Sequence, residues 1–152
     1  MRPLRRSALR DDVGSAALEF ITVGVILLVP MVYLVVALGA IQEQALGAEA
    51  AARQIARTIA RAPDAETAAA GSDAVLAGII DEYGLDEGAV RVSIACTNPA
   101  VACPSPGATL IVTVATRTRL PLVPDLLGLD RSTAVPVQAE AVQKISRMWG
   151  IG

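Results

Sequence analysis

FITVGVILLVPMVYLVVALGAI, residues 20–41, is a run of 22 residues without a charged side chain, and it decides the fold of the chain. An α-helix rises about 1.5 Å per residue, so this run would extend over about 33 Å. The hydrocarbon core of a bilayer is about 30 Å thick. The stretch therefore predicts one membrane-spanning helix.

A single carboxylate touches this run, because Glu19 directly precedes Phe20. A carboxylate at the centre of a bilayer costs on the order of 2.5–3.5 kcal/mol, and less near the interface, so such residues are usually paired or functional. Two interpretations follow. Glu19 either marks the interface, where its carboxylate stays hydrated, or pairs with a charge on a partner.

The charges on the two sides of the run differ in sign. Residues 1–14 carry a net charge of +2, whereas the whole chain carries −2, so the remainder is acidic at −4. The leader contains these charged residues: Arg2, Arg5, Arg6, Arg10, Asp11 and Asp12. Because positive flanks stay on the cytoplasmic side, we expect a cytoplasmic N-terminus and an extracytoplasmic segment after Ile41. The acidic body argues against a nucleic-acid partner.

The residues around the start of the run resemble the class III signal of type IV pilins and pseudopilins. A basic leader is followed by Gly14 and then by Ser15-Ala16-Ala17-Leu18-Glu19-Phe20. In that family a membrane prepilin peptidase cuts after the glycine, and the fifth mature residue is glutamate. The resemblance, which covers residues 10–41, thus implies cleavage between Gly14 and Ser15. The small residues after the glycine, in place of an aromatic first residue, are similar to those of TadE-like pseudopilins from tight-adherence (Flp) pilus systems.

This resemblance implies a non-enzymatic minor pseudopilin that acts in assembly of an adhesive Flp-type pilus. The protein would be held in the cytoplasmic membrane by a single span, and its partners would be the prepilin peptidase, other pilins or pseudopilins, the membrane assembly platform and membrane lipids. Cleavage would leave a positively charged amine on Ser15. Glu19 would pair with that amine, on its own or a neighbouring subunit, because desolvated charges are tolerated only in pairs.

Two other functions stay open. A minor pseudopilin of type II secretion or of DNA uptake would carry the same signal. Alternatively, a signal-anchored or secreted binding domain would use the run as an anchor, or lose it by a signal-peptidase cut after Ala37-Leu38-Gly39, whose small residues permit that cut. Against this alternative, the run exceeds the apolar core of an ordinary signal peptide, about 7–15 residues, and leaves Glu19 without a role.

The helix is expected to continue past the membrane as far as Pro63. Inside the span, Pro30 should kink the helix or melt it locally near residues 26–30. Residues 42–61 contain no proline, and as a helix they would have an apolar face and a charged face. The apolar row is Ala48, Ala52, Ile55 and Ile59, and the charged row is Glu49, Arg53, Arg57 and Arg61. The apolar row needs a domain to pack against.

The next segment predicts a second, short helix. Asp64 is a plausible N-cap, Gly71-Ser72-Asp73 should interrupt the helix, and Gly84 should end it. The hydrophobic period then changes to two, which predicts strands over residues 90–96, 109–119 and 132–144. Residues 120–131 form an irregular crossing loop, and Pro136 places the third strand at an edge or a bulge.

We therefore expect an α+β fold. A long N-terminal helix, first transmembrane and then amphipathic, is followed by a short helix and a three-stranded antiparallel sheet that packs on the long helix. This is also the general layout of pilin subunits. The expected organisation is a leader over residues 1–14, a transmembrane helix over 15–41 and an extracytoplasmic domain over 42–152.

The cysteines and the remaining polar residues indicate structural roles rather than a catalytic or binding site. Cys96 and Cys103 flank a short loop, and in an extracytoplasmic domain they are expected to form a disulfide worth about 2–3 kcal/mol, with two unpaired thiols as the alternative. The chain has no histidine and no phosphate-binding loop, so we predict no enzyme, cofactor or metal site. The acidic pairs Asp81-Glu82 and Asp86-Glu87 are expected to be solvated surface.

Overall fold

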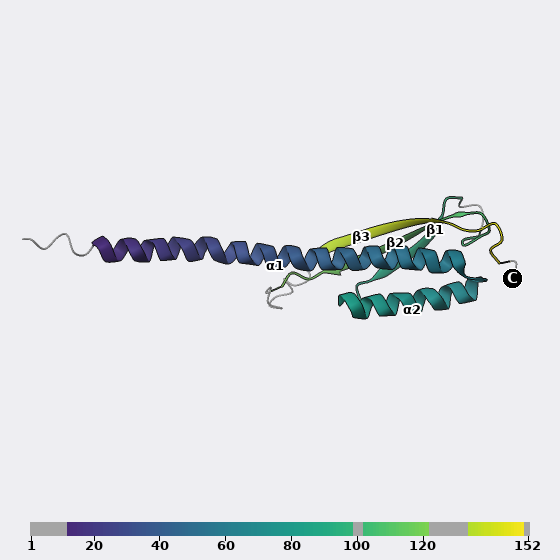
Figure 1. Cartoon of the computed structure of the whole chain (residues 1–152), viewed down its shortest axis with the longest axis horizontal. Coiled ribbons are helices and arrows are strands. Elements are labelled where there is room, and N and C mark those ends of the chain that lie inside the picture. The colour runs from purple at the N-terminus through teal and green to yellow at the C-terminus, as the bar shows by residue number, and fades with distance from the viewer. Residues whose placement is uncertain (1–11, 99–101, 122–133, 151–152) are drawn as a thin grey trace, which may run out of the picture. The chain divides into compact units, whose positions relative to one another are not determined.

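The computed structural model describes residues 12–98, 102–121 and 134–150 (Figure 1). The elements follow the order α1 (Asp12–Arg61), α2 (Ala65–Tyr83), β1 (Arg91–Cys96), β2 (Thr109–Thr118) and β3 (Val135–Lys144). This is the α+β layout that the sequence predicts. The chain divides into two compact units, Met1–Leu38 and Gly39–Gly152, and we call the second unit the head.

The first helix, α1, is a continuous α-helix of 50 residues with Pro30 inside it. The local melting expected near residues 26–30 is therefore wrong, and a kink at Pro30 stays a prediction. The helix begins at Asp12, so the last residues of the expected leader are helical rather than irregular, while residues 1–11 lie outside the described part. Acidic residues at a helix N-terminus and Arg61 in the last turn both complement the helix dipole.

The second helix, α2, begins and ends as predicted. The backbone N–H of Thr67 donates to Asp64 Oδ1 at 2.7 Å, so Asp64 is the N-cap. This hydrogen bond holds the pKa of the Asp64 carboxyl below its usual value of 3.8. At the other end Gly84 adopts φ +58°, a left-handed conformation that favours glycine, and its N–H donates to the Ile80 carbonyl.

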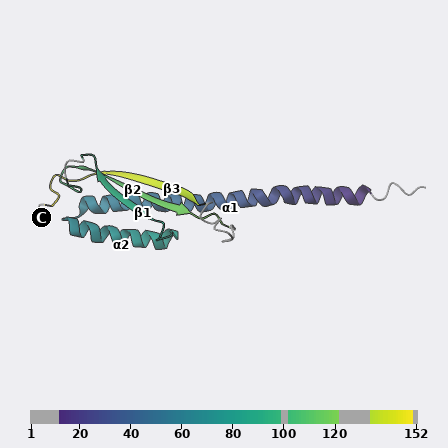
Figure 2. The same cartoon turned by 180° about the vertical axis from the view of Figure 1, so that it is seen from behind.

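The predicted interruption of α2 at Gly71-Ser72-Asp73 is wrong, because the helix runs unbroken for 19 residues. Ser72 Oγ donates to the Ala68 carbonyl at 2.7 Å, so the buried hydroxyl is satisfied within the helix. A Cβ atom on Gly71 would meet Thr58 Cγ2 of α1 at 2.8 Å. The glycine therefore lets α2 approach α1 closely. Figures 1 and 2 show α2 alongside the part of α1 that belongs to the head.

The three strands form one antiparallel sheet of order β1-β2-β3, so β2 is central and β3 is an edge strand. In the register, Val112 lies opposite Ile94 of β1 and opposite Ala141 of β3. Pro136, which has no N–H for a ladder hydrogen bond, thus lies in an edge strand, as predicted. The expected crossing loop over residues 120–131 falls almost wholly outside the described residues.

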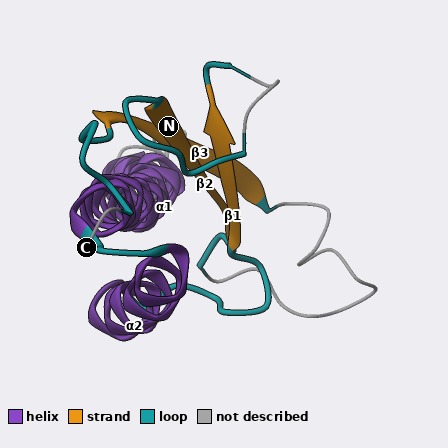
Figure 3. Cartoon of the chain, turned by 90° about the vertical axis from the view of Figure 1, so that its right-hand side faces the viewer, coloured by secondary structure: helices purple, strands orange, loops and turns teal. Residues whose placement is uncertain are grey.

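The core of the head lies between the sheet and the two helices. Ala48, Ala52, Ile55 and Ile59 of α1 are at most 2% exposed, which confirms the predicted apolar face. Leu110, Val112 and Val114 on the inner face of β2 are fully buried against the same cluster. In the end-on view of Figure 3, both helices lie on one side of the sheet. The small alanine side chains allow α1 to lie close to the strands.

The end of the chain returns to this core. The indole Nε1 of Trp149 donates to the Ile59 carbonyl at 3.0 Å. Ile59 is in the last turn of α1, where carbonyl groups lack a partner within the helix. The nearby Ile145 is 1% exposed and belongs to the core cluster. The C-terminal segment therefore adds a hydrogen bond at the end of α1, where the Ala62 N–H lies 3.4 Å from the same carbonyl oxygen.

Gly71 and Gly78 of α2 predict opposite effects of the same substitution. Alanine is the better helix former by about 1 kcal/mol. Gly78 has open space around the position of a Cβ, so Gly78→Ala should raise the free energy of unfolding by up to about 1 kcal/mol. Gly71→Ala should lose that gain to the clash with Thr58, and adding Thr58→Ala should restore it. Thermal unfolding of the full chain in detergent measures both; equal stabilisation by the two single variants would contradict the close approach.

Candidate functional site

The apolar half of α1 is the first candidate site, because its side chains lie exposed. Phe20 is 80% exposed, Leu27 67% and Val35 62%, and the large aliphatic side chains between them are exposed to similar degrees. Within the described residues, one helix is long and apolar enough to cross a membrane, and it lies near the N-terminus. An apolar helix surface of this length requires lipid or a protein partner to cover it. It fits a membrane anchor or a signal segment.

Two polar side chains near the start of this apolar surface differ in their hydrogen bonding. Thr22 Oγ1 donates to the Leu18 carbonyl at 2.7 Å, so its hydroxyl is satisfied inside the helix and is compatible with an apolar environment. Glu19 is exposed and has no ion pair among the described residues. Its carboxylate is therefore the polar group of this region that needs water or a partner.

The predicted cleavage residues lie in the first turns of α1. Gly14 and Ser15 are both helical, and Ser15 precedes Glu19 by four residues, which places the two positions on one face of the helix, one turn apart. A new amine on Ser15 would thus lie within a turn of the Glu19 carboxylate. The cleavage itself and the pairing stay predictions.

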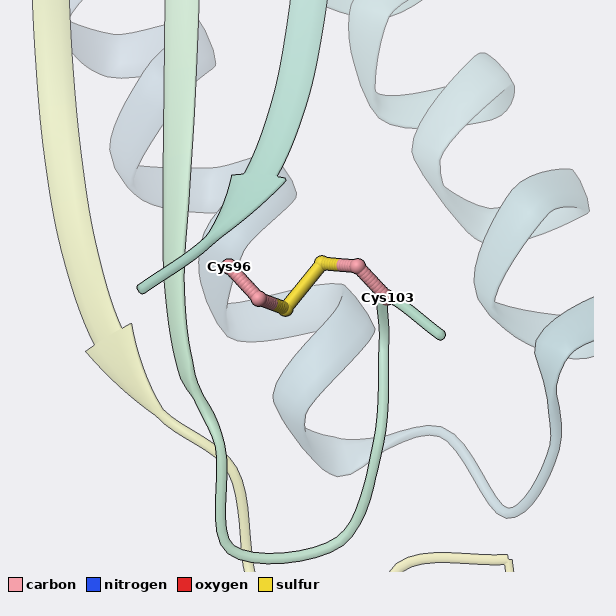
Figure 4. Close-up of a disulfide and its surroundings, with 2 residues drawn as sticks. All are labelled: Cys96 and Cys103. Atoms are coloured by element: carbon pink, nitrogen blue, oxygen red, sulfur yellow. A yellow bond between two sulfur atoms is a disulfide. The ribbon is translucent and has the colours of Figure 1, made fainter. Parts of the chain in front are cut away.

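The cysteine pair forms the predicted disulfide (Figure 4). Cys96 is the last residue of β1, and its Cα lies 5.7 Å from that of Cys103. Just inside the loop, the Thr97 N–H donates to the Thr109 carbonyl at 3.0 Å, which extends the pairing of β1 with β2 by one residue. The bond therefore closes the loop at the end of the hairpin.

Loss of this disulfide should lower the stability of the head. The closed loop is short, with a sequence separation of 7 residues, so the expected loss in the free energy of unfolding is about 2–3 kcal/mol. Chemical unfolding of the full chain with and without a reducing agent measures it. A Cys96→Ser, Cys103→Ser double variant serves as control, because it should match the reduced protein and not respond to reductant. An unchanged unfolding midpoint on reduction would contradict the role of the bond.

The inner face of β1 is incompletely covered. Val92 and Cys96 are half-buried, but Ile94 is 45% exposed. Val92 and Ile94 border a groove of about 260 Å³ between β1 and the helices, lined also by Ile55, Ile59, Ala68, Ser72 and Leu76. β1 is an edge strand, so it has a neighbouring strand on one side alone.

The head also contains a basic groove that the sequence does not predict as a unit. It has a volume of about 540 Å³ and lies between the last turns of α1 and the end of β3. Its lining consists of Arg57, Ala60, Arg61, Gln143, Lys144, Ile145, Ser146 and Arg147. The arginine row of α1 was visible in the sequence, but only the folded sheet brings Lys144 and Arg147 beside it.

Of the two acidic pairs, Asp86 takes part in hydrogen bonds, and the other three residues are exposed. Asp86 Oδ2 accepts from Arg119 at 2.9 Å, and Asp86 Oδ1 accepts from the Gly88 N–H at 3.1 Å. Asp81, Glu82 and Glu87 are exposed. Among the residues that the structure describes, no group of three or more His, Cys, Asp or Glu side chains could hold a metal ion.

Comparison of the chain with models of protein families, with curated proteins and with solved structures finds no match. A function for this protein is therefore argued from its own residues and geometry.

Proposed function

We propose that this chain is a non-enzymatic minor pseudopilin subunit, similar to TadE, that acts in assembly of a Flp-type pilus after cleavage between Gly14 and Ser15. A prepilin peptidase removes the basic leader. The apolar half of α1 holds the subunit in the cytoplasmic membrane, and the head lies outside. From there the subunit joins other pilins or pseudopilins through the membrane assembly platform.

One observation carries the proposal. Glu19 is an exposed carboxylate at the start of an exposed apolar helix, one turn after the glycine and serine of the leader junction, and it has no ion pair within the described part of the chain. A plain membrane anchor can keep this carboxylate hydrated at the interface, but it needs no carboxylate there. A subunit that moves from lipid into an assembly of helices does need one, because a paired charge fixes both attraction and register.

Two further features support the proposal. A long N-terminal helix that continues from an apolar segment into an α+β head is the arrangement that a filament subunit needs, since one part packs in lipid or in a filament core and the other stays in water. The disulfide between Cys96 and Cys103 agrees with an extracytoplasmic head, because oxidising compartments maintain such bonds.

The first test is the N-terminus of the protein recovered from membranes, determined by intact mass with and without prepilin peptidase. We expect a chain that starts at Ser15 only when the peptidase is present. A Gly14→Ile substitution should leave the chain uncut, whereas Thr22→Ala should not affect cleavage. A start at Ala40 would instead identify a secreted domain, and an uncut chain would leave a membrane anchor.

The second test separates insertion from assembly. Glu19→Ala should leave cleavage and membrane insertion unchanged, but it should lower recovery of the subunit in the assembled fraction by about tenfold or more, because the partner charge would stay buried and unpaired. Thr22→Ala is the matched control, since the Thr22 hydroxyl is already satisfied by Leu18. Quantitative immunoblots of the sheared surface fraction and of membranes measure both. Normal recovery of the Glu19→Ala variant would remove the assembly role.

A specific observation also favours a second candidate, a signal-anchored or secreted binding domain. The boundary between the two compact units falls at Leu38/Gly39, next to the predicted signal-peptidase cut. The buried face of α1 within the head begins at Gly47, so a head that starts at Ala40 keeps its core. The mass measurement described above distinguishes this candidate from a pilin-like subunit.

A further inference from the structure

The basic groove concentrates positive charge on one side of the head. Arg57, Arg61, Lys144 and Arg147 line it, all four are exposed, and no carboxylate lines it. None of the four forms an ion pair among the described residues. The head, which is acidic in sum, thus has a groove whose charged lining residues, among those described, are all basic.

The cations at the end of α1 suit the helix dipole but repel one another within one chain. Glu49 pairs with Arg53 at 3.0 Å, but Arg57 and Arg61 continue the same i,i+4 row. Like charges at this spacing destabilise a helix, and Lys144 and Arg147 add to the repulsion from the neighbouring strand end. An anionic partner in the groove would remove this repulsion.

The helix α2 shows the opposite pattern. It carries four carboxylates (Glu66, Asp73, Asp81 and Glu82) and no basic residue. Asp81 and Glu82 lie in its last turn, at the negative end of the helix dipole, where cations are favoured and anions are not. Both side chains are exposed and have no ion pair among the described residues. A cationic partner at this turn would therefore be stabilising.

The two surfaces cannot meet within one head. The last turn of α2 lies beside Gly47 of α1, because a Cβ on that glycine would meet Tyr83 Cβ at 2.9 Å. The groove is lined by Arg57 and Arg61, about three turns or more further along α1. In a second copy the same two surfaces are free. The groove needs negative charge, which α2 supplies, and the last turn of α2 needs positive charge, which the groove supplies.

We propose that the basic groove binds the acidic α2 of a second copy of this chain. The contact joins two different surfaces, so a pair keeps a free α2 on one copy and a free groove on the other, and the association can continue in an open row. It needs only the head, and it holds whether or not the chain is cut at Gly14. Because the charges are exposed, the contact should weaken as salt concentration rises.

The composition of the chain makes a direct test possible. Lys144 is the sole lysine, so it is the one side-chain amine. A carbodiimide joins an amine and a carboxyl group in contact as an amide, with loss of water and without a spacer. The full chain in detergent micelles, mixed in equal parts as unlabelled and ¹⁵N-labelled protein, should give a peptide that links Lys144 of one isotope to Asp81 or Glu82 of the other.

Three variants make the test specific. Lys144→Arg keeps the charge and should abolish the cross-link. Arg57→Glu should lower its yield by about tenfold or more, because it places like charges against each other in the contact. Arg117→Glu, the same charge change at an exposed arginine outside the groove, should leave the yield within about twofold of the wild-type yield, since it adds no charge to the contact.

Two results would overturn the proposal. One is the absence of a mixed-isotope link between Lys144 and α2. The other is an equal loss of cross-link yield in the Arg57→Glu and Arg117→Glu variants. Heparin is the probe for a different occupant. If heparin binds the wild-type protein and not the Arg57→Glu variant while copies give no cross-link, the groove binds a soluble polyanion rather than a second copy.

Discussion

The head depends on one packing contact, that of the small-residue face of α1 on the central strand of the sheet. Alanines at positions 48, 51, 52 and 56 bring the helix backbone close to Leu110, Val112 and Val114, while Ile55 and Ile59 supply most of the apolar volume. With aromatic residues at 3% of the chain, no single side chain dominates this core. Its stability comes from many short contacts, which only close approach provides. The same requirement explains Gly71, where α2 approaches Thr58 of α1.

One continuous helix carries two kinds of surface. Its first half exposes aliphatic side chains, as a membrane-spanning segment would, and Thr22 satisfies its hydroxyl through the backbone of the helix. Its second half buries one face against the sheet and carries charges on another. The change occurs without a break in the helix. Glu19 lies at the start of the apolar half and is the residue there whose environment must change if the helix leaves lipid.

Much of this fold follows from local patterns. The apolar run, the period-two strands, the Asp64 and Gly84 caps and the disulfide each depend on residues close in sequence, and the structure contains all of them. The predictions that failed did so because of contacts between elements far apart in the sequence. Gly71-Ser72-Asp73 resembles a break, yet Gly71 is there for contact with α1 and Ser72 satisfies its hydroxyl within the helix. Ile94 has the inward period of a core residue, but its edge strand lies where the helices cover it incompletely. The basic groove joins residues some ninety positions apart, which no local pattern contains.

The hydrogen bond from Trp149 to Ile59 spans 90 residues of sequence and connects the end of the chain to the end of its first helix. During synthesis, α1 leaves the ribosome long before β2, β3 and Trp149 exist. The alanine face of α1 therefore has no partner in the sheet until those strands have been made. Closing the core of the head depends on contacts between residues far apart in the sequence, of which Trp149 with Ile59 is one. Contacts of this kind form slowly, because a long loop of chain must close before they stabilise anything.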